Sequence, residues 1–233
     1  MAFRKTLNGY VSRVKGEQYE IDERVPAGYL MRIITSRAFM KVWGRLLFPR
    51  RRYSPFVAGS ATVRCRRKIL FGKGVTIAPH VYIDALSSEG ISLGNNVSVG
   101  AHTRIECTGN LRHLGKGLQV EDNVGLGSDN FFGCAGGISI GKDTIIGNFA
   151  SFHAENHNFS NPDLPIRLQG VVHKGIRIGS DCWIGAKCTV LDSVVIEDGC
   201  IIAAGALVTA GIYEKNGIYG GVPAKLLKHR FDA

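Results

Sequence analysis

The sequence lacks several features that would assign it to common classes of protein. Among its 233 residues there is no run of about 20 uncharged apolar residues, which a membrane-spanning helix requires. Its first residues lack the apolar stretch of a secretory signal peptide. The six cysteines show no Cys-x-x-Cys spacing, so a zinc site is not expected. We therefore expect a cytoplasmic protein that binds no metal.

Acidic residues are scarce near the N-terminus. Residues 1–73 carry 17 Lys and Arg against 4 Asp and Glu, a balance of +13, whereas residues 74–233 carry 12 against 15, a balance of −3. The basic character therefore belongs to the N-terminal part alone. Because no recognisable nucleic-acid-binding module accompanies it, nucleic acid is not expected as a partner.

An aliphatic residue recurs at every sixth position between residues 178 and 208. Neither a helix, with 3.6 residues per turn, nor a strand, with a repeat of two, produces this period. It predicts a solenoid of short strands and corners, in which backbone hydrogen bonds run to the coils above and below. Less regular copies occur around residues 77–105, 120–132 and 140–152. The unbroken series is Ile178, Ile184, Val190, Ile196, Ile202 and Val208.

The fifth position of each repeat is small, and three cysteines occupy it. Cys182, Cys188 and Cys200 are therefore expected to be buried packing residues. The chain also contains 30 glycines, which suit the tight corners of such a solenoid.

Helical character is confined to a segment near the N-terminus. Between Ala27 and Phe48 the apolar residues share one broad arc, and a basic stripe of Arg37, Lys41 and Arg45 lies opposite. Pro49 and three arginines follow. Two roles are open and compatible: residues 27–52 contact the inner face of an anionic membrane, or the helix caps the first coil or contacts another subunit.

The six-residue period stops after His157 and resumes at Ile176. The intervening residues, which include Pro162 and Pro165, are expected to leave the solenoid as a loop. Long loops in repeat proteins usually serve binding. His157 at the start of this loop is the leading candidate for a catalytic residue.

Several motifs together resemble the hexapeptide-repeat acyltransferases. A histidine ends a coil, a loop follows, and the next coil reads Ile178-Gly179-Ser180-Asp181-Cys182-Trp183-Ile184-Gly185. The loop segment Pro165-Ile166-Arg167-Leu168-Gln169-Gly170 is similar to the O-acetyltransferases of bacterial cell-surface polysaccharides, and Gly221-Val222-Pro223-Ala224-Lys225 to the family's closing motif. The resemblance covers roughly residues 70–230 and implies a left-handed parallel β-helix.

The expected organisation has three parts. Residues 1–60 form a basic N-terminal appendage with a helix, residues 61–213 form the β-helix with a protruding loop at 158–175, and residues 214–233 form a tail with a short helix. The fold class is an all-β solenoid.

The resemblance implies direct transfer of an acetyl group from acetyl-CoA to a sugar hydroxyl of a polysaccharide or its precursor. His157 would act as general base, because imidazole titrates near neutrality, and a backbone carbonyl or Glu155 would orient it. By position, the backbone amide of Ala186 would stabilise the oxyanion. Candidate contacts to the acceptor, from coil geometry, are Asp129, Asn130, Asn148 and His153.

The resemblance also implies a groove between neighbouring subunits for the pantetheine arm of the donor. A groove walled by small residues on one prism face is shallow, so a second wall from a homotrimer is expected. Lys225, and Lys228 or Arg230, would meet the CoA phosphates. The residues implied along the groove are Trp183, Gly185, Ala203, Ala204 and Gly205.

Three alternatives were weighed. The γ-type carbonic anhydrases use the same prism with three zinc-binding histidines, but the spacing of His153 and His157 does not match theirs. N-acetylation of an amino-sugar nucleotide would use the same base and donor, and only the loop motif at 165–170 favours oxygen. A non-catalytic scaffold is the third alternative, and the histidine at the loop exit argues against it.

Overall fold

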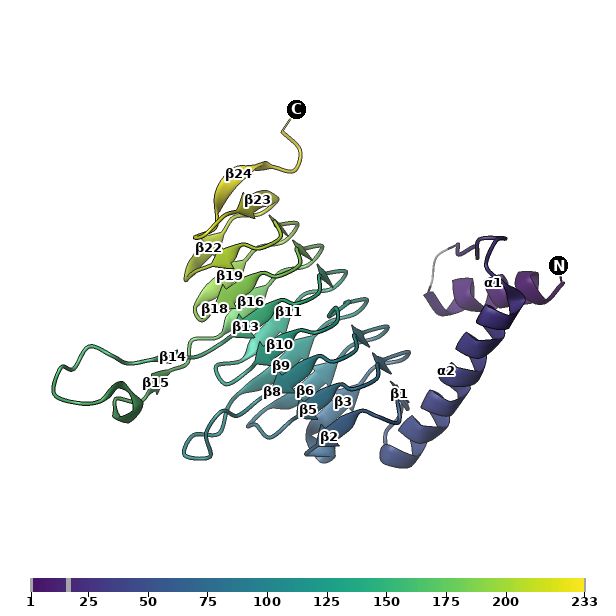
Figure 1. The fold of residues 1–233 in the computed structure, drawn as a ribbon, viewed down its shortest axis with the longest axis horizontal. Coiled ribbons are helices and arrows are strands. Elements are labelled where there is room, and N and C mark those ends of the chain that lie inside the picture. Colours follow the sequence, from purple (N-terminus) through teal and green to yellow (C-terminus); the bar gives the residue numbers. More distant parts are fainter. Residues whose placement is uncertain (1, 16–17, 233) are drawn as a thin grey trace.

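The computed structural model describes residues 2–15 and 18–232 as a three-walled prism of stacked coils, with two helices at one end (Figure 1). The helices are α1 (Ala2–Lys15) and α2 (Ala27–Leu47), and two short 3-10 helices span Arg66–Lys68 and Ile166–Leu168. We name the three sheets of the prism walls A, B and C. Apart from the last strand, neighbouring strands in each wall are parallel, as the solenoid prediction requires.

The strands follow the chain from wall to wall. Wall A contains β1 (Phe56–Val57), β4 (Thr76–Ile77), β7 (Ser98–Val99), β12 (Ile145–Ile146), β17 (Trp183–Ile184), β20 (Ile201–Ile202), β23 (Gly217–Gly220) and β24 (Lys225–His229). Wall B contains β2 (Thr62–Arg64), β5 (Tyr82–Asp84), β8 (Arg104–Glu106), β10 (Phe131–Gly133), β13 (Ser151–His153), β18 (Thr189–Leu191) and β21 (Leu207–Val208). Wall C contains β3 (Ile69–Phe71), β6 (Gly90–Leu93), β9 (Gly117–Val120), β11 (Ile138–Ile140), β16 (Ile176–Ile178), β19 (Val194–Ile196) and β22 (Gly211–Tyr213).

The core is a column of inward-facing side chains, one layer per coil. All six residues of the unbroken six-residue series are buried, which confirms the reading of the period. The rings of Phe132 and Phe152 stack with centroids 4.6 Å apart between successive coils of wall B. Cys182, Cys188 and Cys200 are buried and unpaired, so their assignment as packing residues is also confirmed.

The corners of the prism rely on polar residues that tolerate a left-handed backbone. Asn96, Asn123 and Asp143 have φ of 57°, 61° and 60°, a conformation that asparagine and aspartate adopt at lower cost than most residues. The Asn96 amide donates to Asn123 Oδ1 at 3.1 Å, and the Asn123 amide donates to Asp143 Oδ1 at 2.9 Å. This ladder fixes the stacking of three successive corners.

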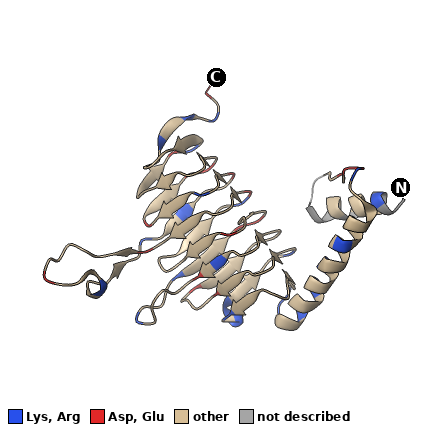
Figure 2. Cartoon of the chain, viewed as in Figure 1, with Lys and Arg blue, Asp and Glu red and all other residues tan. Residues whose placement is uncertain are grey.

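The helix predicted for residues 27–48 corresponds to α2, whereas α1 was not predicted. The C-terminal end of α2 sits on the first coil, where a Cβ at Gly44 would overlap the carbonyl oxygen of Pro55. Phe48 is buried against Phe71, with ring centroids 4.8 Å apart. The rest of α2 extends away from the prism and carries basic but no acidic residues, while acidic residues lie on the prism corners (Figures 1 and 2). No helix in the described ranges is long and apolar enough to cross a membrane.

The C-terminal tail corrects one prediction. The expected short helix in residues 214–233 is instead the strand β24, which turns back and pairs antiparallel with β23. An open last coil would leave unpaired backbone groups along β23, and β24 satisfies them. The coils also extend beyond the predicted limits of 61 and 213, because β1 begins at Phe56 and β23 ends at Gly220.

Candidate active site

A hairpin leaves the prism between walls B and C. Its stem is β14 (Asn156–His157) paired antiparallel with β15 (Val171–Val172), and residues 158–170 form the protruding tip (Figure 1). Within the tip, Gln169 accepts a hydrogen bond from the Asn161 amide at 3.0 Å and donates to the Leu164 carbonyl at 2.7 Å. The loop expected from the sequence is therefore an ordered hairpin, and its stem was not predicted.

His157 lies on the stem strand β14, opposite Val171. Its side chain is exposed, and its imidazole has no hydrogen-bond partner among the described residues. Both ring nitrogens are therefore available to a substrate. Within the same described ranges, no cluster of three or more His, Cys, Asp or Glu side chains is arranged to hold a metal ion.

Glu155 pairs with His173 rather than with His157. The Glu155 carboxylate lies 2.7 Å from Nε2 of His173, and both side chains are about one quarter to one third exposed. The two residues face each other across the base of the hairpin, because they flank β14 and β15 by one residue each. Glu155 therefore closes the stem, and the proposed orientation of His157 by Glu155 has no contact to support it. Equal spacing of the two residues from the strands was the only sequence signal for His173.

Asp192 secures the same end of the hairpin, and sequence reasoning missed it. Its carboxylate is buried and accepts hydrogen bonds from the amides of Lys174 and Gly175 at 3.0 and 2.6 Å. It also accepts one from the Ser193 hydroxyl at 3.1 Å. Residue 192 lies within the repeat, where a polar corner residue gives no sign that it reaches the loop.

His153 lies on the outer face of wall B. Its ring is 5.4 Å from that of Phe131, and partial burial lowers its pKa. Partial burial therefore favours the neutral form of the imidazole. His153 lies on the face of wall B, two residues before Glu155. The hairpin stem starts after Glu155, at the edge of that wall.

The predicted acceptor residues do not share one environment. Asn130 is 2% exposed, and its side chain bonds the carbonyls of Leu126 and Gly147 at 2.5 and 2.9 Å and the Ala150 amide at 2.6 Å. It therefore fixes the corner between coils and cannot contact an acceptor, which corrects the prediction.

Asp129 and Asn148 occupy the corner between walls A and B. Asp129 is exposed and has a left-handed φ of 57°. Asn148 is exposed, and its side-chain oxygen accepts from the Ser128 amide at 2.9 Å. Both are separated from His157 by the width of wall B.

The residues implied for donor binding gather along wall A and its corner with wall B. Trp183 is 52% exposed and lies in register between Ile145 and Ile201 of the neighbouring coils. Ala203 is half-buried and Ala204 exposed, and a Cβ at Gly205 would meet no atom within 4 Å. Gly185 is packed against the backbone of Ala204. Small residues beside an exposed indole leave a shelf against which an extended apolar ligand can lie.

The basic residues near the C-terminus divide into two kinds. Lys225 and Lys228 are exposed on β24, and neither forms an ion pair with a carboxylate among the described residues. Arg230 instead donates to Asp181 Oδ2 at 2.8 Å and to the Gly199 carbonyl at 3.0 Å. Arg230 therefore holds β24 to the preceding coils, and it is not free for a phosphate.

Ala186 lies at the corner between walls A and B. Its carbonyl accepts from the Gly205 amide at 2.8 Å, whereas its own amide has no partner within the part of the chain that the structure describes. His157 leaves from the opposite edge of wall B. About five residues of strand and corner separate the two edges, which corresponds to roughly 15 Å. One chain alone does not bring the two groups together.

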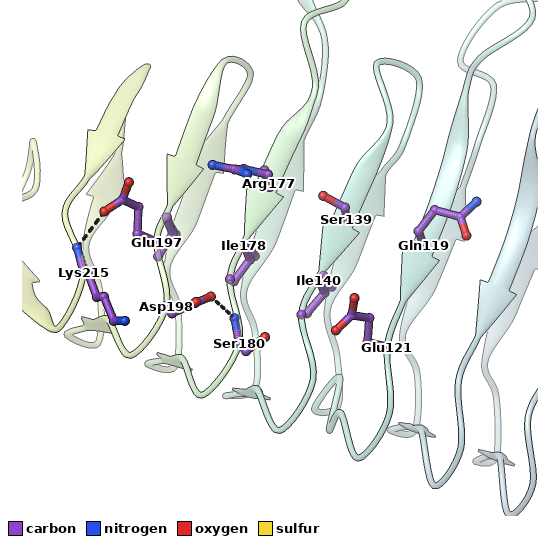
Figure 3. Close-up of a pocket in the computed structure, with 13 residues that line it drawn as sticks. Gln119, Glu121, Ser139, Ile140, Arg177, Ile178, Ser180, Glu197, Asp198 and Lys215 are labelled. Atoms are coloured by element: carbon purple, nitrogen blue, oxygen red, sulfur yellow. Dashed lines mark hydrogen bonds between the residues drawn. The ribbon is translucent and has the colours of Figure 1, made fainter.

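One hollow of the single copy lies elsewhere, on the outer face of wall C (Figure 3). It measures about 470 Å³, and Gln119, Ser139 and Arg177 project from successive strands on its floor. At its rim the Lys215 amide donates to Glu197 at 3.0 Å and the Ser180 amide donates to Asp198 at 2.7 Å (Figure 3). None of the predicted site residues lines this hollow.

Comparison with known proteins supports the fold. Residues 175–210 match the family described as "Bacterial transferase hexapeptide (six repeats)". A probable acetyltransferase of Mycobacterium tuberculosis, Rv3034c, is 31% identical over 119 residues, or 51% of this chain and 36% of that protein. The chain thus spans about a third of the length of this curated relative.

Solved structures share the fold of the prism. Two structures of mutants of AntD, an N-acyltransferase from Bacillus cereus, were determined in complex with coenzyme A and a dTDP ligand. Their TM-scores are 0.51 and 0.52 at 18% identity, with 77% of this chain and 82% of theirs covered. At this identity the likeness concerns the fold alone. Residues 175–210 are therefore similar to the hexapeptide transferase family, and the chain shares the fold of these solved structures.

Proposed function

We propose that this protein is an acetyl-CoA-dependent O-acetyltransferase that acts on a sugar hydroxyl of a cell-surface polysaccharide or its precursor. The observation that carries the proposal is the exposed His157 imidazole, which is free of protein partners at the stem of an ordered hairpin. The probable acetyltransferase activity of the 31% identical relative supports the same class of reaction.

His157 acts as general base in this proposal. A hydroxyl is a weak nucleophile at neutral pH and must lose its proton as its oxygen attacks the thioester carbon. The imidazole accepts that proton, and after the carbon–sulfur bond breaks it returns the proton to the departing thiolate. No acyl-enzyme forms, because the acceptor hydroxyl attacks the thioester directly and no side chain at the hairpin stem is required as a nucleophile.

The amide of Ala186 stabilises the oxyanion that forms at the carbonyl oxygen of the thioester when the hydroxyl attacks its carbon. This amide makes no hydrogen bond within the described ranges, so it can donate to a ligand without breaking an existing bond. Such a preorganised donor contributes about 3–4 kcal/mol to the transition state. The shelf formed by Trp183, Ala203 and Gly205 positions the pantetheine arm beside it.

The complete site requires two copies of the chain. His157 and the Ala186 amide lie on opposite edges of wall B, roughly 15 Å apart in one copy. A homotrimer would bring the hairpin of one copy to the shelf of the next, which also gives the shallow shelf its second wall. Lys225, exposed on β24, would meet the CoA phosphates at one end of that groove.

The test is release of free CoA from acetyl-CoA in the presence of sugar nucleotides, lipid-linked sugars and oligosaccharides. We expect activity with a hydroxyl acceptor and a loss of at least about 100-fold in His157→Ala. His113→Ala, which alters an exposed histidine of another loop, is the matched control and should retain activity.

Two results would contradict the proposal at different points. If calorimetry detects no binding of acetyl-CoA to the wild-type protein, the transferase assignment is wrong. If His157→Ala keeps most of the activity, the assignment of the base is wrong. Activity confined to amino-sugar nucleotides would replace the hydroxyl acceptor with an amine.

A further inference from the structure

The helix α2 places its basic side toward the prism. Lys41 Nζ donates to the Ser54 carbonyl at 2.5 Å and lies 4.7 Å from the centre of the Phe56 ring. The Arg37 guanidinium is 5.5 Å from the same ring. A helix that served only as a cap would direct its apolar side at the first coil. Here Arg37 and Lys41 lie over the first coil instead.

The apolar side of α2 consequently faces away from the prism. Phe39, Val42 and Leu46 are 78%, 60% and 66% exposed, and their spacing of three and four places them on one side of the helix. We name this surface the outer strip, and it also includes Met31 and Trp43. Single exposed apolar residues are ordinary, but five on one side of a helix indicate a contact surface. Nothing within the described ranges covers it.

The chain segment that contains the outer strip is rich in positive charge. Residues 24–73 contain 13 Lys and Arg and no Asp or Glu. Arg32 and Arg45 flank the strip on the helix, Arg50 and Arg52 follow its end, and all four are exposed. Figure 2 shows basic residues at intervals along α2. The charge complements an anionic surface.

A hollow of about 510 Å³ adjoins the strip where α2 meets the segment after it. Its walls include the apolar Val42 and Leu46 and the cations of Lys41, Arg45 and Arg52. Burial lowers the pKa of Lys41, and the charge of Arg45 lowers it further. None of the three cations pairs with a carboxylate in the part of the chain that the structure describes. The hollow therefore combines apolar walls with unpaired positive charge, which suits a phosphate attached to a hydrocarbon chain.

We propose that α2 docks on an anionic phospholipid membrane, with the outer strip at the boundary between headgroups and acyl chains and the cations around the hollow on lipid phosphates. Helices with an apolar face and flanking basic residues bind membranes in this way. A second copy is a poorer occupant, because a twofold contact would place the same acid-free segment against itself. The proposal does not depend on acetyl transfer, and its test requires no donor.

The test is flotation of the full-length protein with vesicles of phosphatidylcholine alone and of equal parts phosphatidylcholine and phosphatidylglycerol. We expect binding to the anionic vesicles and much weaker binding to the neutral ones. The double variant Phe39→Ser, Leu46→Ser should bind about tenfold more weakly or worse, because it removes two apolar contacts. Arg45→Gln with Arg52→Gln should lower the affinity for anionic vesicles by roughly 30-fold.

Leu111→Ser and Arg112→Gln are the matched controls, since both alter exposed residues of a prism loop far along the chain from α2. Both should bind like the wild type. Failure of the wild type to float with anionic vesicles would overturn the proposal, as would unchanged binding of the Phe39→Ser, Leu46→Ser variant. Light scattering gives another result that would overturn the proposal. If neither the wild type nor the Phe39→Ser, Leu46→Ser variant binds vesicles, and the variant dissociates an oligomer that the wild type forms, a second copy covers the strip.

Discussion

Asn130 and Asn148 are the same type of residue at corners of neighbouring coils, yet burial gives them different roles. Asn130 is almost inaccessible and uses its amide for three hydrogen bonds to the backbone. Asn148 is exposed and makes one. A sequence pattern placed both near a corner, but which of them faces inward depends on the rotation of the coil. That rotation is decided by packing.

Asn130→Ala is expected to lower the free energy of unfolding by about 2–4 kcal/mol, because it leaves two buried carbonyls and one amide without a partner. Urea denaturation followed by circular dichroism measures the change. Asn148→Ala, the matched variant, should change the stability by less than about 1 kcal/mol. Equal effects of the two substitutions would contradict the structural role of Asn130.

The buried cysteines make stability depend on alkaline pH. Burial raises the pKa of Cys182 to about 11 from its ordinary 9.0. The folded state therefore holds this proton more tightly than the unfolded state, so stability is constant below about pH 9 and falls as the pH rises above it. We expect a lower urea midpoint at about pH 10 than at about pH 8.

Cys182→Ala should reduce that dependence, since alanine occupies the same buried repeat position at Ala150 and Ala206.

At about pH 8, a thiol reagent should modify Cys65 rapidly in the native protein, because it is the exposed cysteine. Rapid modification of several thiols would show that the column of small residues is more open than the structure indicates.

At the scale of elements, the hairpin stem is the part that sequence patterns could not supply. The interruption of the six-residue period marked where the chain leaves the prism. The pairing of β14 with β15 and the contact between Glu155 and His173 depend on residues 14 to 18 apart coming together. Likewise, Lys225–His229 suits a helix or a strand, and the unpaired edge of β23 decides for the strand.

Glu155→Ala is expected to loosen the hairpin more than it impairs chemistry. Loss of a partly exposed pair costs up to about 1 kcal/mol, so trypsin should cleave after the exposed Arg167 a few times faster. Acetyl transfer should fall by less than about tenfold, far less than in His157→Ala. Glu214→Gln, an exposed acid on another corner, serves as the control. A loss equal to that of His157→Ala, with an unchanged cleavage rate, would place Glu155 directly on His157.

At the scale of the whole molecule, the six-residue repeat predicts the architecture but not which surfaces contact one another or a ligand. The uninterrupted period from Ile178 to Val208 predicted a solenoid, because only inward-facing residues obey it. The orientation of α2 was not predictable in the same way. Helical periodicity defines an apolar arc, but the seat of Gly44 on Pro55 sets which side meets the prism. The sequence likewise does not show how the proposed site assembles, because His157 and the Ala186 amide lie on opposite edges of wall B.

The central claim is that His157 of one copy and the Ala186 amide of another form one acetyl-transfer site. Ala186→Pro removes that amide, and the equivalent corner of an earlier coil already holds Pro79, whose carbonyl accepts from the His102 amide as Ala186 does from Gly205. The direct measurement is CoA release by His157→Ala and Ala186→Pro, each alone and after mixing under conditions that exchange subunits. Each variant alone should be nearly inactive, and the equimolar mixture should recover up to about a quarter of wild-type activity, because some interfaces then contain both intact groups. A mixture with demonstrated subunit exchange that remains as inactive as its components would contradict the account.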